Sequence, residues 1–500
     1  MLFIKNNFDL AVTSFCFFIF SIALVCGYFH EIGTFGVETD FYGTYAVQAH
    51  NILTGKPYTY LHNPPGYPIL VAIFSFLTPD LFTAGKIISA LSIALIGFIN
   101  YLIFKILSNE KIAFLSTIFL LITLIPYSFI ASTDLPGGAF ALIPVLILLS
   151  SNKFSIKAFL VIGISCGISY LIRAESIFII AGIIISVLFV LKNENKKEKI
   201  FKTGLIIFGF VLITSPWFIY NWKTNGSPFA TTAYLQVGLY FYNEKGLEKE
   251  PELKKIIDEE KTSPSILLIN PAKLVWKYLK NIPSRFEYLF IETFSFPLYL
   301  FLGGGIIFFL INLDSKRLSY IIIWLSGFIL LGLISFKLRH YFPLIPLLSF
   351  LIFYSILNEK TSNIVSKKSW IILGLSILLI LFSIKDAYNK TNDFLKSEPK
   401  YLFEISEFLK SHSSKGEIIV SRKPHLAYLS GLKHVFLYEN SKEDFYKKAK
   451  FINARFIVYS DFEAELWPGL QSLNDPDNLK DMFDLVYYHE PTNTMIYEIK

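Results

Sequence analysis

Ionisable side chains that could do chemistry occur at separate places in the sequence, each close to the end of an apolar run. Asp40 follows the first run, Asp134 lies in the turn Ser132-Thr-Asp-Leu-Pro136, and Arg173 and Glu175 share a third turn. The last group consists of Lys337, Arg339, His340 and Tyr341. A carboxylate can act as a general base, and cations can bind an anionic group. These residues can form one site only if the elements between them bring the turns to the same end of the fold.

The composition indicates that those elements lie in a membrane. Apolar residues make up 53% of the chain and charged residues 17%, and there are 50 Phe residues. Soluble proteins have about 45–50% and 25% respectively. The net charge of +7 comes from short Lys and Arg clusters between apolar runs, a pattern that suits membrane orientation rather than nucleic-acid binding. The cysteines, which all lie in apolar runs and indicate no disulfide framework or metal site, are Cys16, Cys26 and Cys166.

Windows of about 20 apolar residues predict a polytopic α-helical membrane protein with about eleven spanning helices. A shorter apolar segment, 68–78, has about a dozen residues between prolines, so we expect it to lie at the interface or re-enter without crossing. The predicted spans lie near 9–29, 82–106, 112–130, 135–151, 155–172, 174–192, 202–221, 294–312, 317–336, 340–357 and 369–385.

The distribution of positive charge predicts the orientation of these spans. If the N-terminus is cytoplasmic, the cytoplasmic loops receive most of the Lys and Arg residues, and the outer connections receive few. The cytoplasmic cations are then Lys111, Lys153, Lys157, those of 192–202, Lys316, Arg317 and those of 360–368. All four groups of ionisable side chains are placed at the outer face of the membrane by this orientation.

Three regions are predicted to lie outside the membrane. The outer loops are 30–81 and 222–293, and the second contains an amphipathic helix that starts at Asn270 and lies on the outer leaflet. The transmembrane catalytic domain is predicted over 1–389, and the tail, 390–500, has the pattern of a small extracytoplasmic α/β domain. The strands predicted in the tail are 417–420, 435–438, 455–459 and 485–488, and a helix is predicted over Ser441–Lys450.

Each ionisable residue also has a purely structural interpretation. Asp134 could cap the following helix, and Arg173 with Glu175 could form a surface ion pair. The cations near residue 339 could anchor lipid headgroups, and His62 could be a turn residue. No His and carboxylate set has metal-ligand spacing. The helix interiors carry almost no charge, which argues against an ion-coupled transporter.

The order of these motifs resembles the polyprenyl-phosphate-dependent GT-C glycosyltransferases, a superfamily that includes protein mannosyltransferases, lipid A aminoarabinose transferases and Rgt-like bacterial transferases. In its first outer loop an Asp precedes a Tyr-x-x-x-Ala helix and a Pro-Pro turn, as Asp40 does here. Phe41 replaces the Glu of protein mannosyltransferases, which counts against protein mannosylation. The resemblance covers about 30–350 and is carried by Thr39–Tyr58, His62–Pro68, Ser132–Pro136, Leu171–Glu175, Ser215–Pro228 and Lys337–Pro346.

The resemblance implies the GT-C fold in a plasma or inner membrane and an inverting transfer from a polyprenyl-phosphate sugar. No metal or other cofactor is required, although Asp40 and Asp134 together could hold a divalent metal. Asp40 would be the base. Asp134, Glu175 and His62 would orient the acceptor, which is a lipid, glycan or protein. The donor phosphate would be bound by Arg173, Lys337, Arg339, His340 and Tyr341.

Two other functions stay open at this point. A lipid-diphosphate-dependent polymerase or ligase would require more Arg residues in the loop 222–293, where Arg285 is the principal Arg. A non-enzymatic transporter is the other alternative. The predicted partners on the main interpretation are the lipid-linked donor and membrane lipids, with no nucleic acid.

Overall fold

The structure is a computed structural model, and by contacts it divides into two compact units. One unit comprises Met1–Gly27 and Asn51–Asp393, and the other comprises Tyr28–His50 and Phe394–Lys500. The stretch 28–50, which the sequence prediction assigned to the transmembrane domain, thus joins the C-terminal residues by its contacts. The described residues are 7–150, 156–190, 195–234, 241–242, 263–293, 299–332, 338–357, 369–437, 439, 441–465, 467–475 and 481–500.

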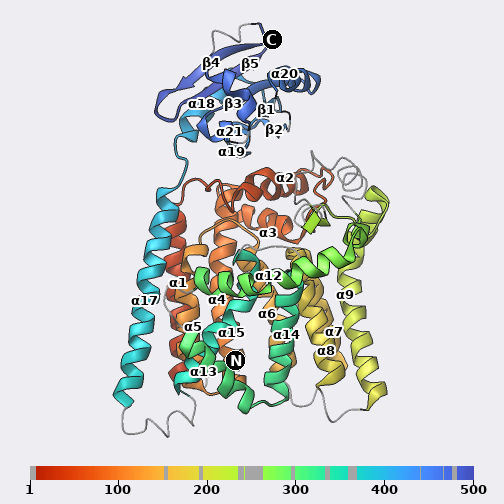
Figure 1. The fold of residues 1–500 in the computed structure, drawn as a ribbon, viewed down its shortest axis with the longest axis vertical. Helices are drawn as coiled ribbons and strands as arrows, with labels where there is room; N and C mark the ends of the chain where they lie inside the picture. Colours follow the sequence, from red (N-terminus) through yellow and green to blue (C-terminus); the bar gives the residue numbers. More distant parts are fainter. Residues whose placement is uncertain are drawn as a thin grey trace. The chain divides into compact units, whose positions relative to one another are not determined.

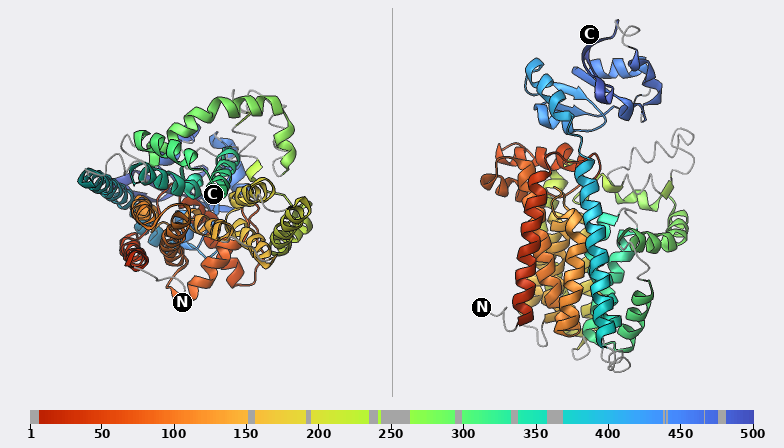
Figure 2. Two further views of the ribbon diagram at one scale, coloured as in Figure 1. Left: turned by 90° about the horizontal axis from the view of Figure 1, so that it is seen from below. Right: turned by 90° about the vertical axis from the view of Figure 1, so that its left-hand side faces the viewer.

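The first unit is a bundle of apolar helices, seen from the side in Figure 1 and nearly end-on in the left view of Figure 2. Each of the predicted spans overlaps one of these helices, which confirms the helical membrane fold class. They are α1 (Asn7–Phe29), α4 (Leu81–Leu107), α5 (Glu110–Leu124), α6 (Asp134–Ser150), α7 (Ile156–Ile172), α8 (Ile177–Phe189), α9 (Lys196–Asn225), α13 (Tyr299–Ile311), α14 (Ser315–Leu331), α15 (Ile345–Leu357) and α17 (Ser369–Lys396).

Among the described residues, 4 helices are long and apolar enough to cross a membrane. They are α1, α4, α9 and the helix Glu110–Tyr127, and further apolar helices are shorter. Large side chains such as Phe17 and Phe189 are 69% and 77% exposed. An apolar surface of this kind is stable against lipid rather than water.

Glycines let some of these helices approach closely. A Cβ on Gly163 of α7 would lie 2.1 Å from the backbone oxygen of Ile206 in α9. On the facing helix, a Cβ on Gly209 would lie 2.6 Å from the backbone oxygen of Leu160. Small residues at such positions allow backbone contact, the usual way that helices associate in lipid.

Two further helices of this unit are the predicted interfacial ones. The helix α3 (Gly66–Phe74) has 9 residues, or about 14 Å of length, too short for a hydrocarbon core of about 30 Å. The helix α12 (Pro271–Thr293) begins where predicted, because the Lys273 N–H donates to the Asn270 side chain at 3.0 Å. Its Trp276 side chain is 71% exposed.

The second unit contains a sheet of order β2-β1-β3-β5-β4. The strands β1 (Ile418–Val420), β2 (Lys433–Val435) and β3 (Ala454–Tyr459) are parallel, and β5 (Thr494–Ile499) pairs antiparallel with β3 and with β4 (Phe483–His489). This α/β fold class was predicted from the sequence and is confirmed. The helices of the domain are α18 (Leu402–His412), α19 (His425–Ser430), α20 (Lys442–Phe451) and α21 (Asp461–Ala464).

The sequence prediction for this domain needs two corrections. The strand predicted over 435–438 is shifted, because β2 ends at Val435 and the following Leu437 leaves the sheet for the core. There the Leu437 carbonyl accepts a hydrogen bond from Trp467 Nε1 at 3.1 Å. The strand β5 was not predicted. The helix α20 does begin at the predicted Ser441, whose side chain accepts from the Asp444 N–H.

Candidate active site

Asp134, Arg173 and Glu175 form a buried ionic cluster in the first unit. Asp134 is the first residue of α6, and Arg173 lies between α7 and the 3-10 turn that precedes α8. Arg173 Nη1 donates to Asp134 Oδ1, and to Thr133 Oγ1 at 3.0 Å. Its Nε atom lies 3.5 Å from Glu175 Oε2. The structure thus brings two of the four sequence groups together.

This cluster balances a buried cation with carboxylates. The Asp134 and Arg173 side chains are both only 6% exposed, so either charge alone would be costly to bury. Gly137, one turn into α6, makes room for the guanidinium arm, since a Cβ there would lie 2.7 Å from Arg173 Cδ. The two carboxylates therefore compensate the charge of the guanidinium within the cluster.

The turn that contains His62 lies in the same unit. Its Nδ1 atom is 3.0 Å from Thr232 Oγ1, and this contact connects the turn to the segment that follows α9. A few residues later, a Cβ on Gly66 would lie 2.5 Å from the carbonyl carbon of Leu171. The Pro-Pro-Gly turn therefore packs on the backbone two residues before Arg173.

The fourth sequence group is only partly described. Lys337 lies outside the described residues, and Arg339 and His340 belong to the 3-10 helix Leu338–Leu344. Tyr341 is 2% exposed. Trp324 of α14 fixes the end of this short helix by donating from Nε1 to the Leu344 carbonyl at 2.8 Å.

Asp40 belongs to the second unit and immediately precedes the π-helix Phe41–Tyr45. Hydrogen bonds hold the backbone of the loop that precedes Asp40. The Phe41 N–H donates to the Glu38 carbonyl at 3.0 Å, and the Tyr42 hydroxyl accepts from the Gly33 N–H at 2.9 Å. The backbone on both sides of Asp40 therefore has a defined conformation, and the carboxylate is partly exposed.

Glu38, two residues before Asp40, is part of a buried ionic triad. His30 Nε2 lies 2.9 Å from Glu38 Oε2, and His30 Nδ1 lies 2.8 Å from Glu398 Oε1. The three side chains are at most 1% exposed. Burial lowers the pKa of His30, but the charges and hydrogen bonds of Glu38 and Glu398 outweigh burial and raise that pKa to about 9. The imidazole is therefore a cation at neutral pH.

His30 and Glu398 were missed by the sequence prediction. His30 directly follows the first predicted span and Glu38 comes 8 residues later, so two ionisable residues at the end of an apolar run were the available signal. Glu398 gave none, because it lies 368 residues away in the sequence. Within the described part of the chain, no group of three His, Cys, Asp or Glu side chains is placed to hold a metal ion.

Comparisons with known proteins relate part of the sequence to a family model and nearly the whole fold to solved structures. Residues 62–220 match the family model described as dolichyl-phosphate-mannose-protein mannosyltransferase. A search of curated proteins gives no match. The matched segment contains Asp134, Arg173 and Glu175.

Solved structures share the fold over nearly the whole chain. ArnT from Cupriavidus metallidurans, bound to undecaprenyl phosphate, is 11% identical with a TM-score of 0.59, covering 99% of this chain and 98% of that one. Archaeal oligosaccharyltransferase AglB from Archaeoglobus fulgidus, in complex with an inhibitory peptide and a dolichol-phosphate, is 11% identical with a TM-score of 0.54, covering 97% and 74%. At such identities the likeness establishes a shared fold.

Proposed function

We propose that the chain is a glycosyltransferase of the GT-C type, which transfers a sugar from a polyprenyl-phosphate donor to an acceptor hydroxyl at the outer membrane face. The family match over 62–220 and the fold shared with ArnT and AglB support this proposal. One observation carries this proposal: the segment matching a mannosyltransferase family, 62–220, contains the buried Asp134–Arg173–Glu175 cluster. The lipids named with ArnT and AglB, undecaprenyl phosphate and dolichol-phosphate, are polyprenyl phosphates and support this class of donor.

The proposed reaction is a single inverting displacement. The acceptor oxygen attacks the anomeric carbon and forms the new glycosidic bond, while the bond from that carbon to the phosphate oxygen breaks. Asp40 takes the proton of the acceptor hydroxyl, so the oxygen becomes a better nucleophile as the bond forms. The polyprenyl phosphate leaves with the bonding electron pair.

The leaving phosphate needs cations, and we assign this role to Lys337 and Arg339, with His340 and Tyr341 beside them. A guanidinium can donate two parallel hydrogen bonds to a phosphate. The sequence prediction also gives Arg173 to the donor phosphate, whereas its ion pairs with Asp134 and Glu175 support a role in holding Asp134 in place. Asp134, Glu175 and His62 would then orient the acceptor. Side chains supply both the base and the cations, so the route requires no metal.

The orientation of the chain is part of the proposal: the N-terminus is cytoplasmic and 390–500 is extracytoplasmic. The concentration of Lys and Arg residues in the predicted cytoplasmic loops supports this orientation. We expect a thiol reagent that cannot cross the membrane to label a Ser414→Cys variant in intact cells and to leave Asn195→Cys unlabelled. Cys16 and Cys166 are buried and Cys26 is half-buried, so both variants are made in a Cys26→Ser background. Outside labelling of Asn195→Cys would overturn this topology.

A panel of lipid donors tests the function itself. Purified protein in lipid should transfer sugar from polyprenyl monophosphate donors and not from sugar nucleotides. Transfer from polyprenyl diphosphate glycans alone would favour the polymerase or ligase alternative. Uptake of a free solute into vesicles without any transfer would favour a transporter.

A further inference from the structure

The strand order of the C-terminal domain creates a crevice of the kind that binds ligands. β1 lies between β2 and β3 in the sheet. The connection that leaves β1 leads to β2 on one side, and the chain then crosses back to β3 on the other side. The connections after β1 and after β3 therefore run in opposite directions. In open α/β sheets, ligands bind outside the carboxyl ends of the strands at this divergence.

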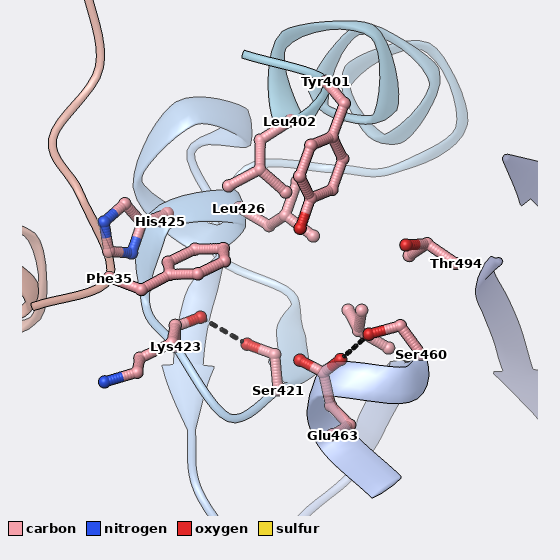
Figure 3. A pocket seen from close by; sticks show the side chains of 11 residues that line it. Phe35, Tyr401, Leu402, Ser421, Lys423, His425, Leu426, Ser460, Glu463 and Thr494 are labelled. Atoms are coloured by element: carbon pink, nitrogen blue, oxygen red, sulfur yellow. Dashed lines mark hydrogen bonds between the residues drawn. The ribbon is translucent and has the colours of Figure 1, made fainter. Parts of the chain in front are cut away.

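A pocket lies at that place, lined by residues that follow β1 and β3. Ser421, Lys423 and His425 follow β1, and Ser460 and Glu463 follow β3. Ser460 donates to the Glu463 carboxylate, and that side chain is 5% exposed. Figure 3 shows these side chains around the crevice, with the Tyr401 hydroxyl pointing into it.

One side chain that lines the crevice comes from a distant part of the sequence. Phe35, from the loop before Asp40, lines the pocket and lies against His425 and Leu426 in Figure 3. Its ring stacks on Phe462 at 4.7 Å between centroids and meets the His425 ring edge-on at 5.0 Å. Phe35 thus forms part of the wall of a crevice at the place where sheets of this topology bind ligands.

The backbone and side chains around Phe35 extend this contact. His425 Nε2 lies 3.3 Å from the Thr34 carbonyl, and Lys423 Nζ donates to Thr39 Oγ1 at 3.3 Å. Burial lowers the pKa of His425 to about 4, so the ring is neutral and can donate from Nε2. On the far side of Asp40, the Tyr42 ring packs on Tyr428 at 4.8 Å.

The ionic triad holds the beginning of the same loop. His30 joins Glu38 of the loop to Glu398, which precedes α18. Glu38 also accepts the Thr34 N–H at 3.0 Å, next to Phe35. Contacts to the C-terminal residues therefore exist both before and after Asp40.

We propose that the C-terminal domain holds the catalytic loop in position, with Phe35 packed against the residues of its crevice as one anchor and the His30–Glu38–Glu398 triad as a second anchor. Phe35 is then a positioning residue that acts through Asp40, an inference that rests on the proposed role of Asp40 as base. Misplacing a catalytic group by about 1 Å can cost on the order of 10²-fold in rate.

A double-mutant cycle tests this inference in the full-length protein. We expect Phe35→Ala to lower kcat by about 10–100-fold while KM for the lipid donor changes by less than about threefold. Phe35→Leu, which keeps most of the apolar volume, should recover most of the loss. In an Asp40→Asn background, Phe35→Ala should cost no more than about twofold, because both changes act on one group. Phe451→Ala, at a Phe that is 80% exposed in the same domain, is the matched control and should be neutral.

Hydrogen exchange gives a readout that does not depend on activity. Amides of 33–45 should exchange faster in Phe35→Ala, while those of β3 and β5 keep their protection and show that the domain is folded. An undiminished Phe35→Ala loss in the Asp40→Asn background would overturn the positioning role, and so would unchanged exchange over 33–45. If Asp40→Asn alone is fully active, the base assignment fails, and the exchange result still decides whether Phe35 holds the loop.

Discussion

Replacing Asp40 with Asn is expected to lower the rate of sugar transfer by roughly 10²–10⁴-fold, the usual contribution of general acid–base catalysis. Asn keeps the size of the side chain and much of its hydrogen bonding, but it cannot accept the proton of the acceptor hydroxyl. Binding of the lipid donor should survive, since other loops hold the phosphate in this mechanism. Initial rates under saturating donor, together with a direct donor-binding assay, separate the two effects.

Asp80→Asn provides the matched control for this variant. Asp80 is exposed and belongs to the same predicted outer loop, where its side chain accepts the Thr83 N–H at 2.9 Å and caps α4. Asn caps helices about as well as Asp does, so this change should leave the rate unaltered. An Asp40→Asn protein that transfers sugar at the wild-type rate would exclude Asp40 as the base and make Asp134 the next candidate.

Arg339→Ala is expected to reduce kcat by about 10²–10³-fold, the effect of removing one donor that stabilises developing charge. Arg339→Lys should retain more activity but remain impaired by about tenfold, because an ammonium cannot make the two parallel hydrogen bonds of a guanidinium. Steady-state kinetics with a polyprenyl-phosphate sugar measures both variants side by side.

Lys223→Ala serves as the control for charge alone. Lys223 is exposed near the end of α9, at the same predicted outer face, and lies in no proposed phosphate site. Its loss should change the rate little at physiological salt, where exposed charges are screened. Full activity in both Arg339→Ala and Arg339→Lys would leave the phosphate role without support.

Much of the fold could be predicted because its signals are local. A run of about 20 apolar residues has few stable alternatives to a membrane helix. Caps are local as well: Asn270 and Ser441 begin α12 and α20 as their residue types indicate. Arg173 and Asp134 could be placed at one face because both occupy turns on the same predicted side of the membrane.

The remaining features depend on contacts between distant residues. Glu398 is paired with His30 across most of the chain, and no periodicity in the sequence reports such a pair. The sequence gives no sign that Phe35 differs from other loop residues, because its contacts depend on the order of β1, β2 and β3 in the sheet. The strand β5 is also set by tertiary pairing, since its main-chain partners lie on β3 and β4.

The configuration of the transferred sugar tests the central claim most directly. A donor of known anomeric configuration is incubated with the purified protein and an acceptor, and the product is examined by nuclear magnetic resonance while free polyprenyl phosphate is quantified. A single displacement with Asp40 as base predicts inversion at the anomeric carbon and one polyprenyl monophosphate released per sugar transferred. Retention of configuration, or release of a polyprenyl diphosphate, would contradict this account.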